Sequence, residues 1–452
     1  MKKLIASVGP WACAWALMAV GMAAGMAAGT ALADPDLRQD VAADYDYLYD
    51  LYRHFHANPE LSFQEEQSAA RLATELQGLG FAVTQRVGGH GIVGVMENGA
   101  GPTVLVRADM DALPIKEQTG LAYASTAMAT DDLGKSVPVM HACGHDMHMT
   151  VFVGTARRLA AMRDGWRGTL VMIGQPAEER GAGAKAMLED GLFERFPRPD
   201  YNLALHVSAG LPAGHVAYVD GYALANVDSV DITVRGVGGH GAYPHTTKDP
   251  VVLSAQIIMA LQTIVSREVS PLEPAVVTVG SIHGGTKHNV IPGQVDLQLT
   301  VRSYGDETRM QVLDAIKRIA EGVARTAGLP DELMPVVRVE TEEFTPATYN
   351  NPELADRMAG VFRTRLGADR VHLAKPVMGG EDFGQYGRVE PKIPSLMFWL
   401  GAVDPAVYRA AQTGGPALPS LHSPFFAPLP EPTVKTGVEA MTAAALDLLG
   451  KP

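Results

Sequence analysis

Two kinds of hydrophobic pattern alternate through the first half of the chain. Apolar residues recur at helical spacing in three stretches, residues 41–56, 65–79 and 150–162. Short β-branched runs lie between them, at residues 92–96, 103–107, 169–173 and 203–207. Strands that are apolar on both faces and alternate with helices are typical of a mainly parallel sheet flanked by helices. We therefore predict an α/β fold for this part.

The pattern changes near residue 227. Half-exposed strands, which alternate apolar and polar residues, are predicted at 229–235, 276–282 and 294–301, with amphipathic helices at 250–264 and 309–327. This β-α-β-β-α order predicts a smaller α+β domain, residues 227–337, inserted into the larger one. The α/β character resumes afterwards, so residues 34–226 and 338–452 are predicted to be the two parts of the larger domain.

The first 33 residues have the composition of a secretory signal peptide. Lys2 and Lys3 precede a long apolar stretch, and Ala31-Leu32-Ala33 supplies a small-x-small cleavage pattern. We expect a periplasmic or secreted mature protein. The apolar stretch is also long enough for an uncleaved membrane anchor, which stays open as an alternative. No later segment is expected to span a membrane.

The net negative charge of the chain argues against partners that bind basic surfaces. The 452 residues carry a net charge of −13, and nucleic acids and anionic membranes both bind basic surfaces. We therefore expect neither nucleic acid nor, after signal cleavage, a membrane as a partner.

Cys143 is the only cysteine of the predicted mature chain, because Cys13 lies within the signal peptide. It cannot form an intrachain disulfide, and it lies in the run His141-Ala142-Cys143-Gly144-His145-Asp146-Met147-His148. A free cysteine is often a small buried hydrophobe. With three histidines nearby in the sequence, a metal-bound thiolate is the better interpretation.

Other metal-binding side chains follow predicted strands. Asp109 and Asp111 come after one strand and the pair Glu178-Glu179 after the next, while His206 is near the end of a third. His422 lies in a loop far downstream. Singly, such residues are more often structural. Together they offer what a metal site needs, ligands that converge from the ends of strands in a rigid sheet.

Seven motifs carry a resemblance to a known family: RHFHANPELS (53–62), RADMDALP (107–114), HACGHDMH (141–148), QPAEE (175–179), GGHGAYPH (238–245), NVIP (289–292) and EDF (381–383). The chain resembles the hippurate hydrolase and indole-acetyl-amino-acid hydrolase family, part of the wider aminoacylase and carboxypeptidase G-like superfamily. The resemblance extends from about residue 45 to about residue 445.

The resemblance implies a site with two divalent metal ions, manganese or zinc and also cobalt in some members. Its ligand pattern falls on five residues of this chain: Cys143, His145, Glu179, His206 and His422. The thiolate of Cys143 would bridge the metals. Glu178 matches the catalytic glutamate, which assists the attack of metal-bound water and returns the proton to the departing amine.

The resemblance also assigns residues outside the ligand set. His240, in the inserted domain, would stabilise the oxyanion in the site of a partner subunit. Asn289 would hold the substrate carboxylate, and Asp111 would orient a ligand histidine. Asp109, His141, His148 and Glu381 stay open between a supporting and a structural role.

The function predicted on this basis is hydrolysis of an N-acyl or N-aroyl amino acid to a carboxylic acid and a free amino acid. The larger domain would be catalytic, and the inserted domain would be a lid that joins two chains into a homodimer. A carboxypeptidase or dipeptidase of the same fold is the alternative within enzymes. A periplasmic solute-binding protein is the alternative from another class. Residues 127–139 and 404–419 are longer than the family pattern and are expected to border the pocket.

Overall fold

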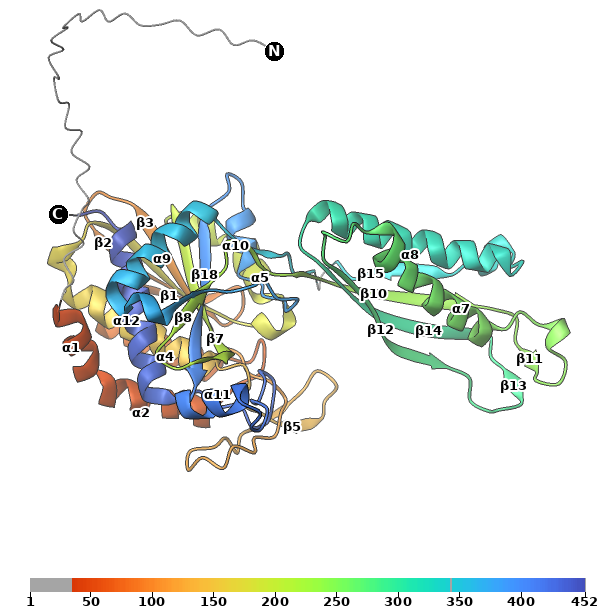
Figure 1. Ribbon diagram of the computed structural model, residues 1–452, viewed down its shortest axis with the longest axis horizontal. Coiled ribbons are helices and arrows are strands. Elements are labelled where there is room, and N and C mark those ends of the chain that lie inside the picture. The colour runs from red at the N-terminus through yellow and green to blue at the C-terminus, as the bar shows by residue number, and fades with distance from the viewer. Residues whose placement is uncertain (1–34, 342–343, 452) are drawn as a thin grey trace, which may run out of the picture. The chain divides into compact units, whose positions relative to one another are not determined.

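The computed structural model describes residues 35–341 and 344–451 (Figure 1). The predicted signal peptide and its cleavage site lie outside the described residues. The chain forms one large mixed sheet covered by helices, and a second, four-stranded sheet built from residues 226–339.

The large sheet has eight strands in the order β1-β2-β6-β3-β7-β18-β8-β17. Their bounds are β1 Ala82–Val87, β2 Gly91–Asn98, β3 Thr103–Asp109, β6 Gly168–Gln175, β7 Tyr201–Pro212, β8 Val216–Tyr218, β17 Val371–Leu373 and β18 Ser395–Val403. The central strands β6, β3, β7 and β18 run parallel, whereas β1, β2 and β6 pair in antiparallel fashion at one side. The carboxyl ends of the four central strands therefore meet at one edge, as predicted.

Both faces of this sheet are buried. On β3, Val104 and Val106 belong to one hydrophobic cluster, and Leu105, between them, belongs to another on the opposite face. The first face is covered by α1 Pro35–Ala43, α2 Tyr45–Ala57, α3 Glu66–Gly78, α4 His145–Ala161, α9 Pro352–Leu366 and α12 Pro430–Leu448 (Figure 1). The second is covered by α5 Gly183–Glu189, α6 Leu192–Arg195 and α10 Gly384–Arg388.

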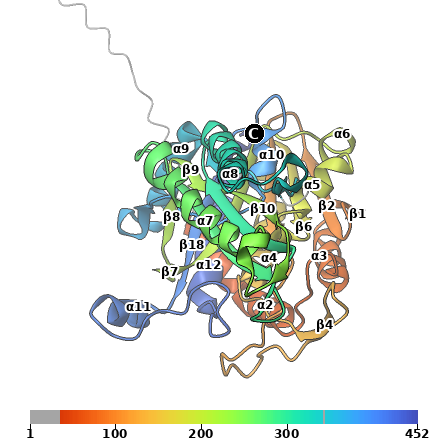
Figure 2. The same ribbon diagram turned by 90° about the vertical axis from the view of Figure 1, so that its right-hand side faces the viewer.

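The four-stranded sheet is antiparallel in the order β12-β14-β10-β15. The helices and strands of residues 226–339 are, in chain order, β10 Asn226–Arg235, β11 Gly239–His240, α7 Pro250–Thr263, η4 Ile264–Glu268, β12 Ala275–Gly284, β13 Val290–Ile291, β14 Gln294–Ser303, α8 Asp306–Thr326 and β15 Val336–Val339. Helices α7 and α8 lie side by side on one face (Figures 1 and 2). Together they bury a hydrophobic core separate from that of the large sheet.

Three elements differ from the sequence prediction. The helix expected at 41–56 is two helices, α1 and α2, which meet near Asp44. Strand β15 adds a fourth strand to the inserted sheet. Helix α4 begins at His145 rather than at residue 150, because its first turn buries polar side chains and so shows no apolar periodicity.

The expectation that no later segment approaches the length of a transmembrane span is also wrong. Helix α7 and the wider turn η4 form a continuous stretch, Pro250–Glu268, that is long and apolar enough. One face of it, through Leu253, Ile257 and Leu261, packs into the core of the inserted domain. The helix is apolar on its other side as well.

Candidate metal centre and catalytic site

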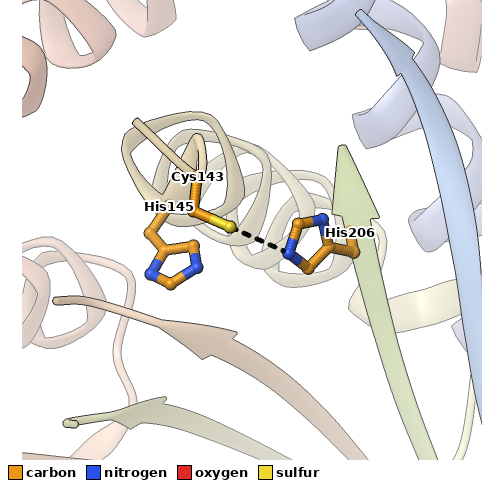
Figure 3. A group of neighbouring side chains, drawn as sticks. All are labelled: Cys143, His145 and His206. Carbon is orange, nitrogen blue, oxygen red and sulfur yellow. Dashed lines mark hydrogen bonds between the residues drawn. The ribbon is translucent and has the colours of Figure 1, made fainter. Parts of the chain in front are cut away.

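The site is built around the start of α4 and the end of β7. Gly144 has a φ of +82° directly before the helix, and this turn places Cys143 and His145 on either side of it. His206, on β7, approaches from the sheet, with its Nε2 3.5 Å from Cys143 Sγ (Figure 3). The ligand atoms of these three buried residues all lie within 4.8 Å of one another.

The two histidines present their Nε2 atoms to this cluster. His145 Nδ1 lies 2.8 Å from the backbone carbonyl of Asp111, and His206 Nδ1 lies 2.7 Å from that of Val207. A carbonyl oxygen only accepts, so each Nδ1 carries a proton, and each Nε2 offers its lone pair to a cation when the ring carries no second proton. His145 Nε2 is buried and has no hydrogen-bond partner among the described residues.

Glu179 and His422 complete a second group with Cys143. His422 Nε2 lies 3.4 Å from Glu179 Oε2, and the other carboxylate oxygen, Oε1, is buried without a partner in the described structure. The backbone N–H of His422 donates to the carbonyl of Ala142 at 2.9 Å, which ties the distant loop to the Cys143 turn. Cys143 thus belongs to two overlapping sets of ligands.

This donor set fits two divalent cations. Sulfur, imidazole nitrogen and carboxylate oxygen are the usual zinc donors, and the free Nε2 and Oε1 atoms lack protein partners. Burial, followed by Glu381 and Glu179, raises the pKa of Glu178, and burial followed by Glu179 raises the pKa of the Cys143 thiol. Two divalent cations would offset the repulsion between these carboxyl and thiol groups when they are ionised.

The surrounding acids hold the ligands in place. Asp111 Oδ2 accepts hydrogen bonds from Ser62 Oγ at 2.6 Å and from Glu179 N at 3.0 Å, and its Oδ1 lies 3.3 Å from His145 Nδ1. Burial alone would lower the pKa of His145, but Asp109 and Asp111 outweigh it and raise the pKa to about 10. Asp111 is therefore placed where its predicted orienting role requires.

Of the residues left open by the sequence, three have clear contacts. His148 Nδ1 donates to Asp109 Oδ1 at 2.6 Å, and its Nε2 accepts from Val207 N at 2.9 Å, so both of its nitrogens are used. Glu381 accepts from Arg107 Nη2 at 2.8 Å. Both ring nitrogens of the fourth, His141, are buried without a partner among the described residues.

Glu178 lies next to the ligand cluster without belonging to the predicted ligand set. It begins the short 3-10 turn η2, Glu178–Arg180, that follows β6. Its Oε2 is 3.9 Å from His145 Nε2. The residue before it, Ala177, has a φ of +49°, which turns the chain sharply from the strand toward the cluster.

A cavity of about 990 Å³ opens onto this cluster. Cys143, Glu178, Glu179, His206 and His422 line it. So does a residue that the sequence did not indicate, Arg302 at the end of β14 in the inserted domain. On an alternating strand Arg302 looks like an ordinary outward-facing charge, so only the fold reveals its position.

Arg302 lies in a half-buried position without an acidic partner among residues 35–341 and 344–451. It donates to Thr300 Oγ1 at 3.1 Å and to the carbonyl of Met378 at 3.4 Å. Burial lowers the pKa of its guanidinium. A half-buried cation that faces a cavity favours an anionic ligand.

Other predicted residues are not brought to this cavity. His240 lies on β11, and Asn289 directly precedes β13, the strand that pairs with β11; Gly241 N donates to Asn289 O at 2.8 Å. Both are exposed, and neither lines the cavity in the described chain.

The two long segments expected to border the pocket do not line it either. Residues 127–139 form a hairpin of β4 Met128–Thr130 and β5 Ser136–Pro138, and residues 404–419 carry α11 Pro405–Gln412. Asp132 of the hairpin pairs at 2.7 Å with Arg180, which lines the cavity.

Comparisons with known proteins agree with this geometry. The family model described as peptidase family M20/M25/M40 matches residues 105–445. A relative called thermostable carboxypeptidase 2, from Saccharolobus solfataricus, is 36% identical and covers 81% of this chain and 88% of its own length. The hippurate hydrolase of Campylobacter jejuni is 37% identical over 74% of this chain and 84% of its own.

Among solved structures, a dinuclear metal-binding peptidase of the M20 family from Bacillus subtilis is similar in fold. Its TM-score is 0.72 at 29% identity, covering 90% of this chain and 99% of that chain. This likeness fits a donor set in which one cysteine belongs to two groups of ligands.

Proposed function

The chain belongs to peptidase family M20/M25/M40 and is a metal-dependent hydrolase of amide bonds, and on that premise we propose that its substrate is an N-acyl or N-aroyl amino acid. The products would be a carboxylic acid and a free amino acid. The observation that carries this proposal is a single cavity with the ligand cluster and Glu178 on one side and Arg302 on another. Membership of a peptidase family also argues against a solute-binding protein.

Metal binding and proton transfer are assigned to different residues in this proposal. Cys143, His145, Glu179, His206 and His422 would hold two divalent metals, which when bound polarise the amide carbonyl and lower the pKa of water. Glu178, which is not among these ligands, would take the proton from the attacking water on one carboxylate oxygen. The same oxygen would then deliver that proton to the leaving nitrogen.

Arg302 supports an amino-acid leaving group. An amino acid released from an N-acyl substrate has a carboxylate one carbon away from the scissile nitrogen. A planar guanidinium binds such a carboxylate through two parallel hydrogen bonds. We infer that Arg302 fixes the substrate carboxylate in this cavity, a role that the family resemblance assigns to Asn289, which does not line it.

A carboxypeptidase or dipeptidase activity is the second candidate. The relative from Saccharolobus solfataricus bears the name of a carboxypeptidase, and a C-terminal peptide substrate also carries a carboxylate next to the scissile amide. A carboxylate bound by Arg302 is common to both kinds of substrate. The two activities therefore differ only in the group on the carbonyl side of the scissile amide.

We further propose that the enzyme is exported and dimeric. Export rests on the composition of residues 1–33. Dimerisation is supported by the exposed apolar side of α7, where Val252 and Met259 are 55% and 71% exposed, and by Ile282 on the edge strand β12, which is 52% exposed. An apolar helix beside an unpaired strand edge is a favourable surface for association.

The test is hydrolysis of a panel of N-acetyl and N-benzoyl amino acids and of dipeptides by the mature protein loaded with manganese, zinc or cobalt. We expect release of an amino acid from the N-acyl substrates and loss of activity with a chelator. Glu178→Gln should keep both metals and lose at least about a thousandfold in kcat, the scale of a positioned proton-transfer group. Turnover of dipeptides alone would favour the second candidate, and a metal-loaded, fully active Glu178→Gln enzyme would refute the role of Glu178.

A further inference from the structure

The turn between α2 and α3 contacts the segments that carry the catalytic acids. The motif at 53–62, to which no role has been given, begins in the last turn of α2 and ends in this turn. The carbonyl of Glu60 accepts from Ala112 N at 2.8 Å, and Ser62 Oγ donates to Asp111 Oδ2 at 2.6 Å. Three residues beyond the motif, Glu65 reaches the segment that carries Glu178.

Glu65 is completely buried and uses one oxygen for two backbone groups. Its Oε1 accepts from Phe63 N at 2.9 Å and from Ala177 N at 2.8 Å. Its Oε2 is buried without a partner in the described structure. No cation is paired with Glu65 among the described residues, so this carboxyl loses its hydration without an ion pair in return.

The two N–H groups belong to unusual residues. Phe63 and Ala177 have φ angles of +61° and +49°, and they are two of the four non-glycine residues with positive φ in the described chain. A positive φ is unfavourable for residues with a Cβ and persists where surrounding contacts enforce it. Phe63 lines the cavity, and Ala177 immediately precedes Glu178.

Glu65 is not needed as the cap of its own helix. It lies directly before α3 but makes no side-chain hydrogen bond to the first turn. Glu60 caps α3 instead, because its carboxylate accepts from Gln67 N at 3.0 Å and from Ser68 N at 2.8 Å. Capping therefore does not explain why a carboxyl is buried at position 65.

We propose that Glu65 is a positioning residue that fixes the backbone at Ala177, and through it the carboxylate of Glu178, while holding Phe63 in the cavity wall. The part that concerns Glu178 rests on the proposed function. One buried oxygen thereby links the segment that carries Glu178 to Phe63 in the wall of the cavity. Loss of this oxygen would let both turns relax toward negative φ and would misplace the Glu178 carboxylate.

Two substitutions distinguish the role of Glu65 Oε1 as a hydrogen-bond acceptor from the role of the carboxylate charge. Glu65→Gln keeps an acceptor at the same distance, and it resembles the protonated acid that is well populated at neutral pH, since burial followed by Asp111 raises the pKa of Glu65 to about 8. Glu65→Asp keeps the carboxyl group but is one methylene too short to reach both N–H groups.

We expect Glu65→Gln to stay within about threefold of the wild-type kcat and Glu65→Asp to lose about a hundredfold, as misplacement of a catalytic group does. Glu65→Asp should also change the ratio of kcat/KM between N-benzoyl and N-acetyl substrates, because Phe63 lines the cavity. Both variants should bind two metal ions per subunit.

Amide hydrogen exchange gives a readout that does not depend on activity. In metal-free protein, Glu65→Asp should accelerate exchange of the Phe63 and Ala177 N–H groups, and Glu65→Gln should not. This measurement stands even if the wild-type enzyme hydrolyses none of the proposed substrates, so the two proposals can fail separately.

Glu60→Asp is the matched control. It shortens a carboxylate that also accepts from two backbone N–H groups, but these belong to α3. It should lower the free energy of unfolding and leave kcat and the exchange of Ala177 unchanged. Wild-type kcat in Glu65→Asp, slow exchange of Ala177 in that variant, or a Glu65→Gln enzyme as impaired as Glu65→Asp would each overturn the proposal.

Discussion

Which ring nitrogen donates a hydrogen bond decides which nitrogen of His145 and of His206 can bind a cation. His145 and His206 each donate a hydrogen bond from Nδ1 to a backbone carbonyl, which directs both Nε2 atoms toward the site beside Cys143 where a cation would bind. The carbonyl that accepts from His145 belongs to Asp111, whose side chain also accepts from the backbone N–H of Glu179. A single residue therefore orients two of the predicted ligands.

Arg302 is the single residue on which the proposed substrate class depends most. We predict that Arg302→Ala lowers kcat/KM by about 10- to 100-fold, since a hydrogen-bonded charge contributes roughly 1.5–3 kcal/mol. Most of the effect should be a higher KM, because the carboxylate is bound equally in the ground and transition states. Steady-state kinetics on an N-acyl amino acid measures both constants.

Arg302→Lys should recover only part of the loss, because an ammonium lacks the paired N–H groups of a guanidinium. Arg338→Ala serves as a control, since Arg338 lies in the same inserted sheet and pairs with Glu340 at 2.7 Å. If the wild-type enzyme hydrolyses the corresponding amino-acid amide as well as the acid, Arg302 does not bind the carboxylate.

At the scale of elements, the site depends on how α2, α4 and a surface loop are joined. His56, near the end of α2, has Nδ1 2.7 Å from Asp146 in the first turn of α4 and Nε2 3.0 Å from Glu117 in the loop. All three side chains are buried. The His56 imidazolium therefore holds α4, the helix that carries His145, to α2 and to the loop that carries Glu117.

This contact predicts a specific dependence of stability on pH. Burial opposes the charge on His56, but Asp146 and Glu117 outweigh it and raise its pKa from 6.5 to about 9. The stabilisation is therefore complete below pH 6.5 and is lost as the pH rises through 9. It amounts to on the order of 3 kcal/mol, at 1.36 kcal/mol for each pKa unit.

Urea unfolding of metal-free wild-type and His56→Gln proteins between pH 6 and pH 10 measures this effect. The difference in free energy of unfolding between the two should shrink as the pH rises. His54→Gln, on the exposed side of the same helix, should give a small difference that does not shrink in this way as the pH rises, because burial lowers rather than raises the pKa of His54. A gap between wild type and His56→Gln that is constant over this range would show that His56 is neutral in the folded protein.

At the scale of the whole molecule, the inserted domain contributes in two ways. Arg302 lines the cavity, whereas His240 and Asn289 are exposed elsewhere in the same domain, on β11 and directly before β13. For His240 to stabilise an oxyanion, it has to reach a site that its own described chain does not form around it. A dimer joined through this domain would supply one.

We predict that Met259→Asp combined with Ile282→Asp converts a dimer into a monomer, because charges on the apolar side of α7 and on the edge of β12 would be buried without partners. Light scattering after size-exclusion chromatography measures the mass. Met310→Asp is the control, since Met310 is also exposed but lies on α8. Its mass should match that of the wild type.

The activity of the double variant separates two roles of the dimer. If His240 acts in the site of a partner subunit, the monomer should lose kcat together with its mass change. Restored activity in a mixture of inactive Glu178→Gln and His240→Ala chains would support the same exchange between subunits. A fully active monomer would restrict His240 to its own chain.

The sequence by itself determined the fold class and, through its resemblance to a known family, predicted the ligand cluster. Period-two and period-3.6 patterns depend on local backbone geometry, so the central strands and most helices were predicted within a few residues. Residue chemistry, motif spacing and the family resemblance brought Cys143, His145, Glu178, Glu179, His206 and His422 into one hypothesis. The structure brings their ligand atoms together in overlapping groups, and all of them except His145 line one cavity.

Tertiary structure alone decided the rest. Helix α4 begins at His145 because buried polar groups are satisfied by distant carbonyls and carboxylates, and no local pattern records such partners. Arg302 and Glu65 look like ordinary surface charges in the sequence. Their environment is set by segments more than 70 residues away, since Arg302 contacts Met378 and Glu65 contacts Ala177, and a contact of that kind exists only once the chain has folded.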